Sequence, residues 1–306
     1  MLEAPEFPGA QASERQTHFD SDGQRLCLHE WGDPQGTPLV LCHGLWDHAH
    51  AFDLLAPYLA EKYRVIAIDA RGHGDSAWVD NYAWPHMTFD LVRVLKCVAG
   101  PRGALLVGHS YGGGLASHAA CIAPELVYKL VNIDGFGPGT DEHPLPGGAD
   151  FPELGSVAAF RAYLDLRRKA QSFMEWRPYA ALDQLVARRK RMNPRLSDAW
   201  LRYFCWHGSR RSSDGWRWKA DPNAGVGAGP FKAEWVGRHW RNLKCPMLAI
   251  VADQPDSWGP LAPALLDARL AQVPLLERAQ VPGTGHFPHM EEPHATAKLL
   301  LDYLQS

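Results

Sequence analysis

The stretch G-A-L-L-V-G-H-S-Y-G-G-G, from Gly103 to Gly114, decides the fold class. Its first half is an apolar run with the composition of a buried strand, and a helical pattern begins at Tyr111. Between the two, a G-x-S-x-G turn places Ser110 where a strand passes directly into a helix. Small residues are needed on both sides of this serine because a sharp turn brings neighbouring chain segments close together. The stretch therefore predicts a nucleophilic serine at the end of a strand.

Outward from this stretch, short apolar runs alternate with longer amphipathic segments. The apolar runs are Arg25–Glu30, Pro38–Cys42, Arg64–Asp69, Gly103–Gly108, Leu130–Ile133, Met247–Val251 and Leu275–Leu276. The amphipathic segments are Ala51–Lys62, Thr88–Ala99, Tyr111–Ala123, Leu261–Gln272 and His294–Leu304. This alternation predicts a mostly parallel sheet with helices on both faces. The first strand, around His18–Phe19, is joined to the second by D-S-D-G, which predicts an antiparallel hairpin.

The alternation divides the chain into parts. Residues 1–16 are poor in apolar side chains and are expected to form an N-terminal arm. Residues 17–137 and 238–306 are expected to form the α/β core. The intervening residues 138–237 lack the strand rhythm and are rich in Trp and Arg, with helical patterns at Leu182–Met192 and Asp198–Trp206. This segment is expected to form a helical cap inserted between two strands of the sheet.

Composition excludes several functional classes. The net charge of −3 gives no general attraction to nucleic acid or to an anionic membrane, and paired arginines such as Arg188-Arg189 are interpreted as solvated faces. No apolar run approaches the roughly 20 residues that span a bilayer, and the first residues do not resemble a secretion signal. The six cysteines contain no C-x-x-C pair, which favours reduced core thiols. We expect a cytoplasmic protein that acts on a small molecule, without nucleic-acid or membrane partners; a homodimer is left open.

Four motifs in order make the chain resemble the α/β-hydrolase superfamily, from about His18 to Leu304. They are L-C-H-G-L-W-D at Leu41–Asp47, D-A-R-G-H-G-D-S at Asp69–Ser76, the serine turn at Gly103–Gly114, and G-T-G-H-F-P-H-M-E-E-P at Gly283–Pro293. The resemblance implies an α/β-hydrolase fold with a mostly parallel eight-stranded sheet and an inserted helical cap. S-D-G-W-R-W-K-A-D-P, at Ser213–Pro222, further resembles the caps of serine-hydrolase-like members, for which no substrate is implied.

The resemblance also implies roles for individual residues. His286 is then the general base for Ser110, in preference to His289 and His294, because it follows the Gly-Thr-Gly turn. The backbone N–H groups of Leu45 and Tyr111 would form the oxyanion hole. The substrate pocket is expected to include His43, Gly44 and Trp46, with His43 orienting its loop.

The third catalytic group must be a carboxylate that orients the imidazole. The family usually supplies it a few residues after the strand that follows the cap, which favours Asp256. Asp134, one strand earlier, is the alternative acid, and Asp253 is less suited because it is too close to the strand. Ala252 stands where the family usually has a glycine, so these alternatives remain open.

A serine at this turn excludes the aspartyl-ester chemistry of dehalogenases and epoxide hydrolases, because serine works through an acyl-enzyme. We expect hydrolysis of a carboxylic ester, or a related acyl bond, of a small apolar substrate. C–C bond hydrolysis, cofactor-free perhydrolysis and a receptor without turnover are the alternatives. The H-x-H pair at His48 and His50 lacks the Asp-His that follows in zinc hydrolases, so no catalytic metal is expected. Nucleotide-binding motifs are also missing, and no cofactor is expected.

Overall fold

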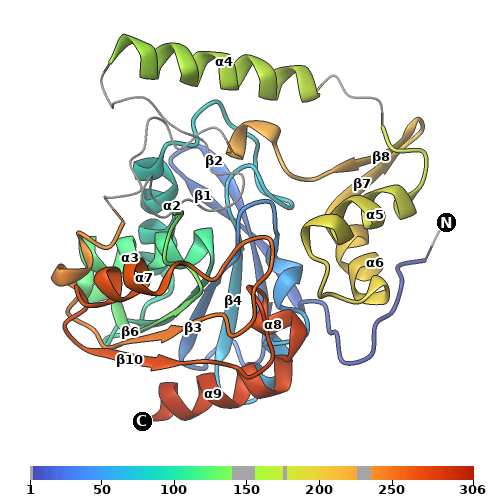
Figure 1. The fold of residues 1–306 in the computed structure, drawn as a ribbon. Coiled ribbons are helices and arrows are strands. Elements are labelled where there is room, and N and C mark those ends of the chain that lie inside the picture. Colours follow the sequence, from blue (N-terminus) through green and yellow to red (C-terminus); the bar gives the residue numbers. More distant parts are fainter. Residues whose placement is uncertain (1–2, 140–155, 175–177, 226–235) are drawn as a thin grey trace.

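The computed structural model describes residues 3–139, 156–174, 178–225 and 236–306. Its main sheet has eight strands in the order β1-β2-β4-β3-β5-β6-β9-β10 (Figure 1). The strands are β1 (Arg15–Ser21), β2 (Gln24–Trp31), β3 (Pro38–Cys42), β4 (Arg64–Asp69), β5 (Ala104–His109), β6 (Val127–Ile133), β9 (Met247–Ile250) and β10 (Leu276–Ala279). Strand β2 pairs antiparallel with β1 and β4, and the remaining neighbours are parallel. The α/β-hydrolase fold expected from the sequence is confirmed.

The first hairpin closes at the D-S-D-G turn that predicted it. Ser21 pairs with Gln24, and the two residues between them, Asp22 and Gly23, have φ angles of 56° and 77°. Two consecutive positive φ angles are the signature of the type I′ turn, whose twist matches that of the flanking strands.

Helices cover both faces of the sheet (Figure 1). They are α1 (Ala56–Ala60), α2 (Trp84–Val98), α3 (Tyr111–Ile122), α7 (Pro263–Leu270), α8 (Pro288–Glu291) and α9 (Pro293–Gln305), with short 3-10 turns η1 (Ala49–Phe52), η2 (Pro124–Leu126) and η5 (Trp240–Asn242). Leu106 of β5 packs in the core formed with α2, α3 and α7, whereas its neighbour Leu105 packs in the core with α1 and α9. Successive side chains of a strand point to opposite faces, so one apolar run supplies both cores. None of the described helices is long and apolar enough to cross a membrane.

The single helix expected over Ala51–Lys62 is instead split into η1 and α1. Pro57 lies in the first turn of α1. A proline disfavours helical geometry at the residue before it and cannot donate a helical hydrogen bond, so it begins a helix better than it continues one.

The segment between β6 and β9 contains two helices that match the predicted ones, at Leu182–Met192 and Asp198–His207. It also contains elements that the sequence did not predict, among them the helix Val157–Met174 and a two-stranded ribbon. In the described part of this segment the helices are α4 (Val157–Met174), α5 (Leu182–Met192) and α6 (Asp198–His207), followed by a ribbon of β7 (Ser209–Ser212) and β8 (Gly215–Trp218) and by η3 (Pro222–Gly225). The ribbon is short and mostly polar, so it carries little strand signal. Helices α5 and α6 share a core that also holds Phe7, whose ring lies 5.3 Å from that of Trp200. The N-terminal arm therefore packs against helices α5 and α6.

Candidate active site

Ser110 stands at the turn between β5 and α3, half-buried, with φ 53° and ψ −121°. A residue other than glycine rarely adopts a positive φ, so the surrounding structure must hold this conformation in place. The Ser110 N–H donates to the Ile133 carbonyl at 2.8 Å, and the Ser110 carbonyl accepts from the Gly114 N–H at 3.1 Å. Hydrogen bonds on both sides of the residue thus stabilise the strained turn.

The glycines around Ser110 are required by backbone packing. A Cβ on Gly108 would lie 2.3 Å from the Gly112 carbonyl oxygen, and a Cβ on Gly112 would lie 2.4 Å from the Cys42 carbonyl oxygen. Asn132 reinforces the turn, because its side-chain amide donates to the Gly113 carbonyl at 3.2 Å. These contacts explain in physical terms why the turn has the form G-x-S-x-G-G.

His43 connects the loop after β3 to the turn after β4. Its Nδ1 donates to the Gly44 carbonyl at 2.7 Å, and its Nε2 accepts the Ala70 N–H at 3.0 Å. Both ring nitrogens are therefore occupied, and the side chain is 3% exposed. This geometry supports the expected orienting role, but it leaves His43 no polar atom to offer a substrate.

The two amides expected to form the oxyanion hole lie in suitable elements. Tyr111 is the first residue of α3, where backbone N–H groups have no acceptor within the helix and the helix dipole favours negative charge. Leu45 precedes Trp46, a non-glycine residue with φ 59° and an exposed fraction of 38%. The loop thus turns sharply directly after Leu45, the residue expected to supply the second N–H donor.

A buried ion pair joins this loop to the cap. The Asp47 carboxylate accepts a hydrogen bond from the Arg189 guanidinium of α5, and Arg189 also donates to the Trp46 carbonyl at 3.3 Å. Burial disfavours ionisation of Asp47, but the charge and hydrogen bond of Arg189, together with the neighbouring His109 and His43, outweigh it and lower the pKa of that carboxyl. The interpretation of Arg188-Arg189 as a solvated face was wrong for Arg189, which is 6% exposed. The two partners are 142 residues apart along the chain, so the sequence alone does not reveal this contact.

His286 contacts Asp134. Its Nδ1 lies 2.6 Å from Asp134 Oδ2, and because a carboxylate can only accept, Nδ1 carries a proton, which leaves Nε2 unprotonated in the neutral imidazole. Burial by itself lowers the pKa of His286, but the hydrogen bond and charge of Asp134 outweigh it and raise that pKa. Asp134 directly follows β6, has φ 48°, and also accepts the Ala252 N–H at 3.2 Å. The imidazole is therefore fixed in the tautomer that a general base needs.

Asp256, the acid favoured by the sequence, does not contact the imidazole. Its Oδ2 accepts the backbone N–H of His286 at 2.7 Å, and its Oδ1 accepts the Trp258 N–H at 2.7 Å. Asp253 likewise accepts a backbone N–H, that of Gly283, at 2.7 Å. Both carboxylates brace the loop that carries His286. The geometry corrects the preference for Asp256 and supports the alternative, Asp134.

The other histidines near this loop are packed or exposed. His109 is fully buried beneath the serine turn, and its Nε2 donates to the His286 carbonyl at 2.8 Å. Burial lowers the pKa of His109 to about 3, so its ring stays neutral. His289 is also fully buried, and burial holds its pKa well below the ordinary value. His294 is exposed and packs on Tyr58. His286 is thus the histidine of this loop whose Nδ1 is hydrogen-bonded to a carboxylate.

A cavity of about 610 Å³ lies between the loop at Trp46 and the cap. Aromatic side chains form much of its wall: Trp46, Trp78, Tyr179, Trp216 and Trp218. Its charged side chains are Asp47 and six cations, Lys169, Arg188, Arg189, Arg210, Arg217 and Lys219. The predicted pocket residue Trp46 therefore lines a space that is aromatic and also basic, and the basic character was not anticipated from the sequence.

Comparisons with known proteins identify the family of the chain. The family model described as "Alpha/beta hydrolase family" matches residues 39–299. A "Serine hydrolase-like protein" of Danio rerio is 34% identical over 110 residues, but these cover only 35% of this chain and 33% of that protein. Longer matches are a "Probable serine hydrolase" of Drosophila melanogaster, 26% identical over 90% of this chain and 83% of that protein, and an "sn-1-specific diacylglycerol lipase ABHD11" of Xenopus laevis, 24% identical over 90% and 82%.

Solved structures show the same fold. A thioesterase domain from the curacin biosynthetic pathway superposes with a TM-score of 0.74 at 20% identity, covering 94% of this chain and 99% of that one. An E-2-(acetamidomethylene)succinate hydrolase also gives 0.74, at 21% identity, covering 95% and 99%. At these identities the likeness concerns the fold alone.

Proposed function

The chain belongs to the alpha/beta hydrolase family, whose model matches most of its length, and from that premise we propose that this enzyme hydrolyses carboxylic esters or related acyl bonds through an acyl-enzyme on Ser110. The observation that carries the proposal is the contact between His286 Nδ1 and Asp134 Oδ2 at 2.6 Å, in a loop bonded directly to the residue before Ser110. A nucleophile, a base in the correct tautomer and an orienting carboxylate are thus supplied by strand ends and loops at one edge of the sheet.

The proposed reaction follows from the tautomer. His286 Nε2, which is unprotonated, accepts the Ser110 hydroxyl proton as the oxygen attacks the acyl carbon, and the imidazolium is stabilised by Asp134. The N–H groups of Leu45 and Tyr111 stabilise the negative charge on the carbonyl oxygen. The imidazolium then returns the proton to the leaving alcohol, and water releases the acyl group by the same steps in reverse order.

The substrate is proposed to be small and largely apolar, with its non-reacting part against the aromatic wall near Trp46. Because the charged side chains of the cavity are mostly basic, esters that also bear a carboxylate belong in any test. Long-chain glycerides belong there too, because one relative is described as a diacylglycerol lipase. C–C bond hydrolysis and perhydrolysis would use the same three side chains, so only substrates distinguish them. A receptor without turnover is disfavoured because Ser110, His286 and Asp134 are all present and the His286 imidazole is held on Asp134.

The test is a panel of p-nitrophenyl esters of increasing acyl length, extended with carboxylate-bearing esters, a diacylglycerol, a dienoate ring-fission compound and a peracid assay. Each compound is offered to the wild type and to Ser110→Ala in parallel. We expect ester turnover by the wild type that falls to background in the variant. Ester turnover that survives in Ser110→Ala would contradict the proposal. Turnover of the dienoate without any ester would replace it with C–C bond hydrolysis.

A further inference from the structure

A second group of polar side chains lies where η1 of the body meets the end of α6 in the cap. It consists of His50, Asp53 and His207, and one donor atom from each lies within 4.8 Å of the others. His50 Nδ1 donates to Asp53 Oδ2 at 2.8 Å, and the His50 and His207 rings stack with centroids 4.1 Å apart. Two imidazoles and a carboxylate are the donors that zinc and related transition metals prefer.

The carboxylate of this group is buried and only half satisfied. Asp53 is 0% exposed, and its Oδ2 accepts both His50 Nδ1 and the Tyr203 hydroxyl, the latter at 2.5 Å. Its Oδ1 has no hydrogen-bond partner within the described residues. A buried carboxylate oxygen without a hydrogen-bond partner is costly. A cation in contact with this oxygen would remove the cost.

The cap supplies its ligand from the last residue of α6. The His207 ring packs on the rings of His50 and Tyr203, with centroids 4.1 and 4.6 Å away. A neutral imidazole offers one nitrogen lone pair to a metal. The cationic Lys219 does not stand uncompensated beside His207, because its ammonium pairs with Asp75 at 2.8 Å.

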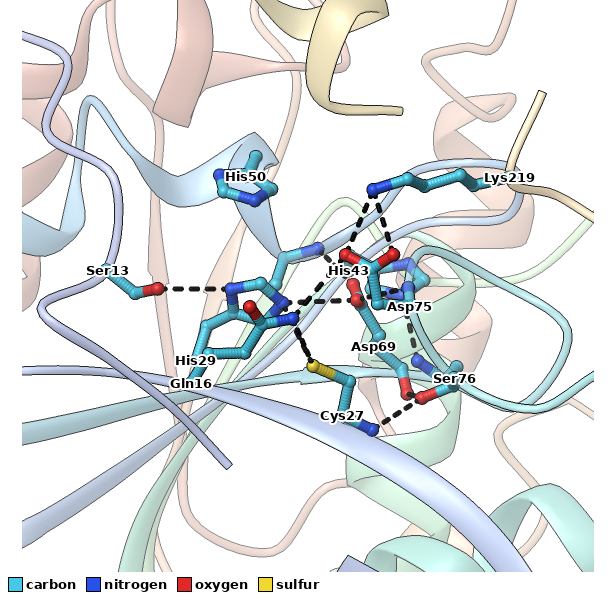
Figure 2. Close-up of polar contacts among 12 residues, drawn as sticks. Ser13, Gln16, Cys27, His29, His43, His50, Asp69, Asp75, Ser76 and Lys219 are labelled. Atoms are coloured by element: carbon cyan, nitrogen blue, oxygen red, sulfur yellow. Dashed lines mark hydrogen bonds and ion pairs between the residues drawn. The ribbon is translucent and has the colours of Figure 1, made fainter. Parts of the chain in front are cut away.

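A neighbouring group of similar composition shows the contrast. Cys27, His29 and Asp69 also lie within ligand distance of one another, but Figure 2 shows them in a closed network. His29 contacts Asp69 at 3.2 Å and Cys27 at 3.4 Å, and burial is outweighed by these partners, which raise its pKa to about 10. Both Asp69 oxygens also accept backbone N–H groups, from Ala49 at 2.7 Å and Asp75 at 2.8 Å. This second network braces the turn after β4 and leaves no donor atom for a metal.

We propose that His50, Asp53 and His207 bind a divalent transition-metal ion of the zinc class, which joins the cap to the body. Ligand distances of about 2.0–2.2 Å require the three donor atoms to draw closer, and a water molecule completes four-coordination. The Tyr203 hydroxyl orients the ligating carboxylate from outside the coordination shell. The H-x-H pair of the sequence is not the site: His48 donates through Nε2 to the Phe204 carbonyl at 3.1 Å. The ion has no part in the reaction at Ser110.

The test uses the full chain, stripped with EDTA and freed of chelator. Addition of Co²⁺ is expected to give visible d–d absorption that saturates at one equivalent, and Zn²⁺ is expected to displace it and to raise the melting temperature. His207→Gln should weaken Co²⁺ binding by more than the roughly 100-fold upper range of outer-shell changes, because it removes a ligand. The exposed His18→Gln is the matched control and should bind as the wild type does.

Further measurements keep the outcome clear. Metal-free wild type and His207→Gln should have similar melting temperatures and circular dichroism, and His50→Gln should lose binding in the same way. Proteolysis within residues 138–237 should slow on adding Zn²⁺ to the wild type but not to His207→Gln. Absence of stoichiometric Co²⁺ binding by the folded wild type, or equal binding by His207→Gln, would show a hydrogen-bonded cluster only and overturn the proposal. None of these readouts depends on hydrolysis by the protein.

Discussion

Replacing Asp134 with Asn should abolish turnover by changing the tautomer of His286. Asp134 Oδ1 accepts the Ala252 N–H at 3.2 Å, and Oδ2 accepts His286 Nδ1–H at 2.6 Å. An asparagine that keeps its oxygen on Ala252 turns its NH₂ group toward Nδ1, which must then accept. The proton moves to Nε2, so the base can no longer take the Ser110 proton. A wrong tautomer costs roughly 10⁴-fold in kcat, equivalent to about 5.5 kcal/mol of barrier.

Asp256→Asn is the matched comparison. It removes one acceptor from the backbone N–H groups of His286 and Trp258, each 2.7 Å from a carboxylate oxygen. The cost is about 1–2 kcal/mol, or at most roughly 30-fold if all of it appeared in the barrier. The assay is kcat on the best ester of the panel, with melting temperatures to confirm that both variants fold. A loss near 10⁴-fold for Asp256→Asn, with Asp134→Asn within tenfold of the wild type, would refute this assignment.

Three other perturbations test separate parts of the account. The raised pKa of His286 predicts that kcat/KM falls toward acidic pH with an apparent pKa above 6.5, because only the neutral imidazole acts as a base. An apparent pKa below 6.5 in the pH profile would contradict that direction. The same raised pKa contributes stability that is complete below pH 6.5 and lost as pH rises through the folded-state value. Gly112→Ala should cost about 3 kcal/mol of unfolding free energy in urea, because its Cβ would lie 2.4 Å from the Cys42 carbonyl oxygen. Arg189→Ala should lower the free energy of unfolding in urea by about 3–5 kcal/mol, because it leaves Asp47 buried and without its ion-pair partner.

The last two predictions have controls in the same chain. A Cβ on Gly100 would meet nothing within 4 Å, so Gly100→Ala should leave the free energy of unfolding nearly unchanged. Arg191 lies in the same helix as Arg189 but is exposed, and Arg191→Ala should be nearly neutral. Equal losses in a variant and its control would mean that the named contact is not the cause.

The features that sequence predicts well here depend on neighbouring residues. Ser110 is marked by the glycines that its turn requires, and the hairpin before β2 by two residues that tolerate positive φ. Buried strands such as β3 and β4 match their predicted runs residue for residue, because the interior of a strand buried on both faces must be apolar.

The features that sequence misses depend on residues far apart. Asp134 and Asp256 both follow strands of the sheet, and their spacing cannot show which carboxylate meets the ring of His286 and which meets its backbone. That choice depends on the strained backbone at Asp134, 152 residues before His286. Arg189 was misread for the same reason, because its acid lies in another part of the fold. The ribbon of β7 and β8 carries too few apolar residues to be recognised.

The central claim is that Ser110 is an activated nucleophile. The most direct measurement is mass spectrometry of the folded protein after reaction with a fluorophosphonate. We predict one adduct on the peptide that contains Ser110, absent from Ser110→Ala and strongly slowed in Asp134→Asn. A folded wild type that remains unlabelled, or that is labelled at another residue, would contradict the claim.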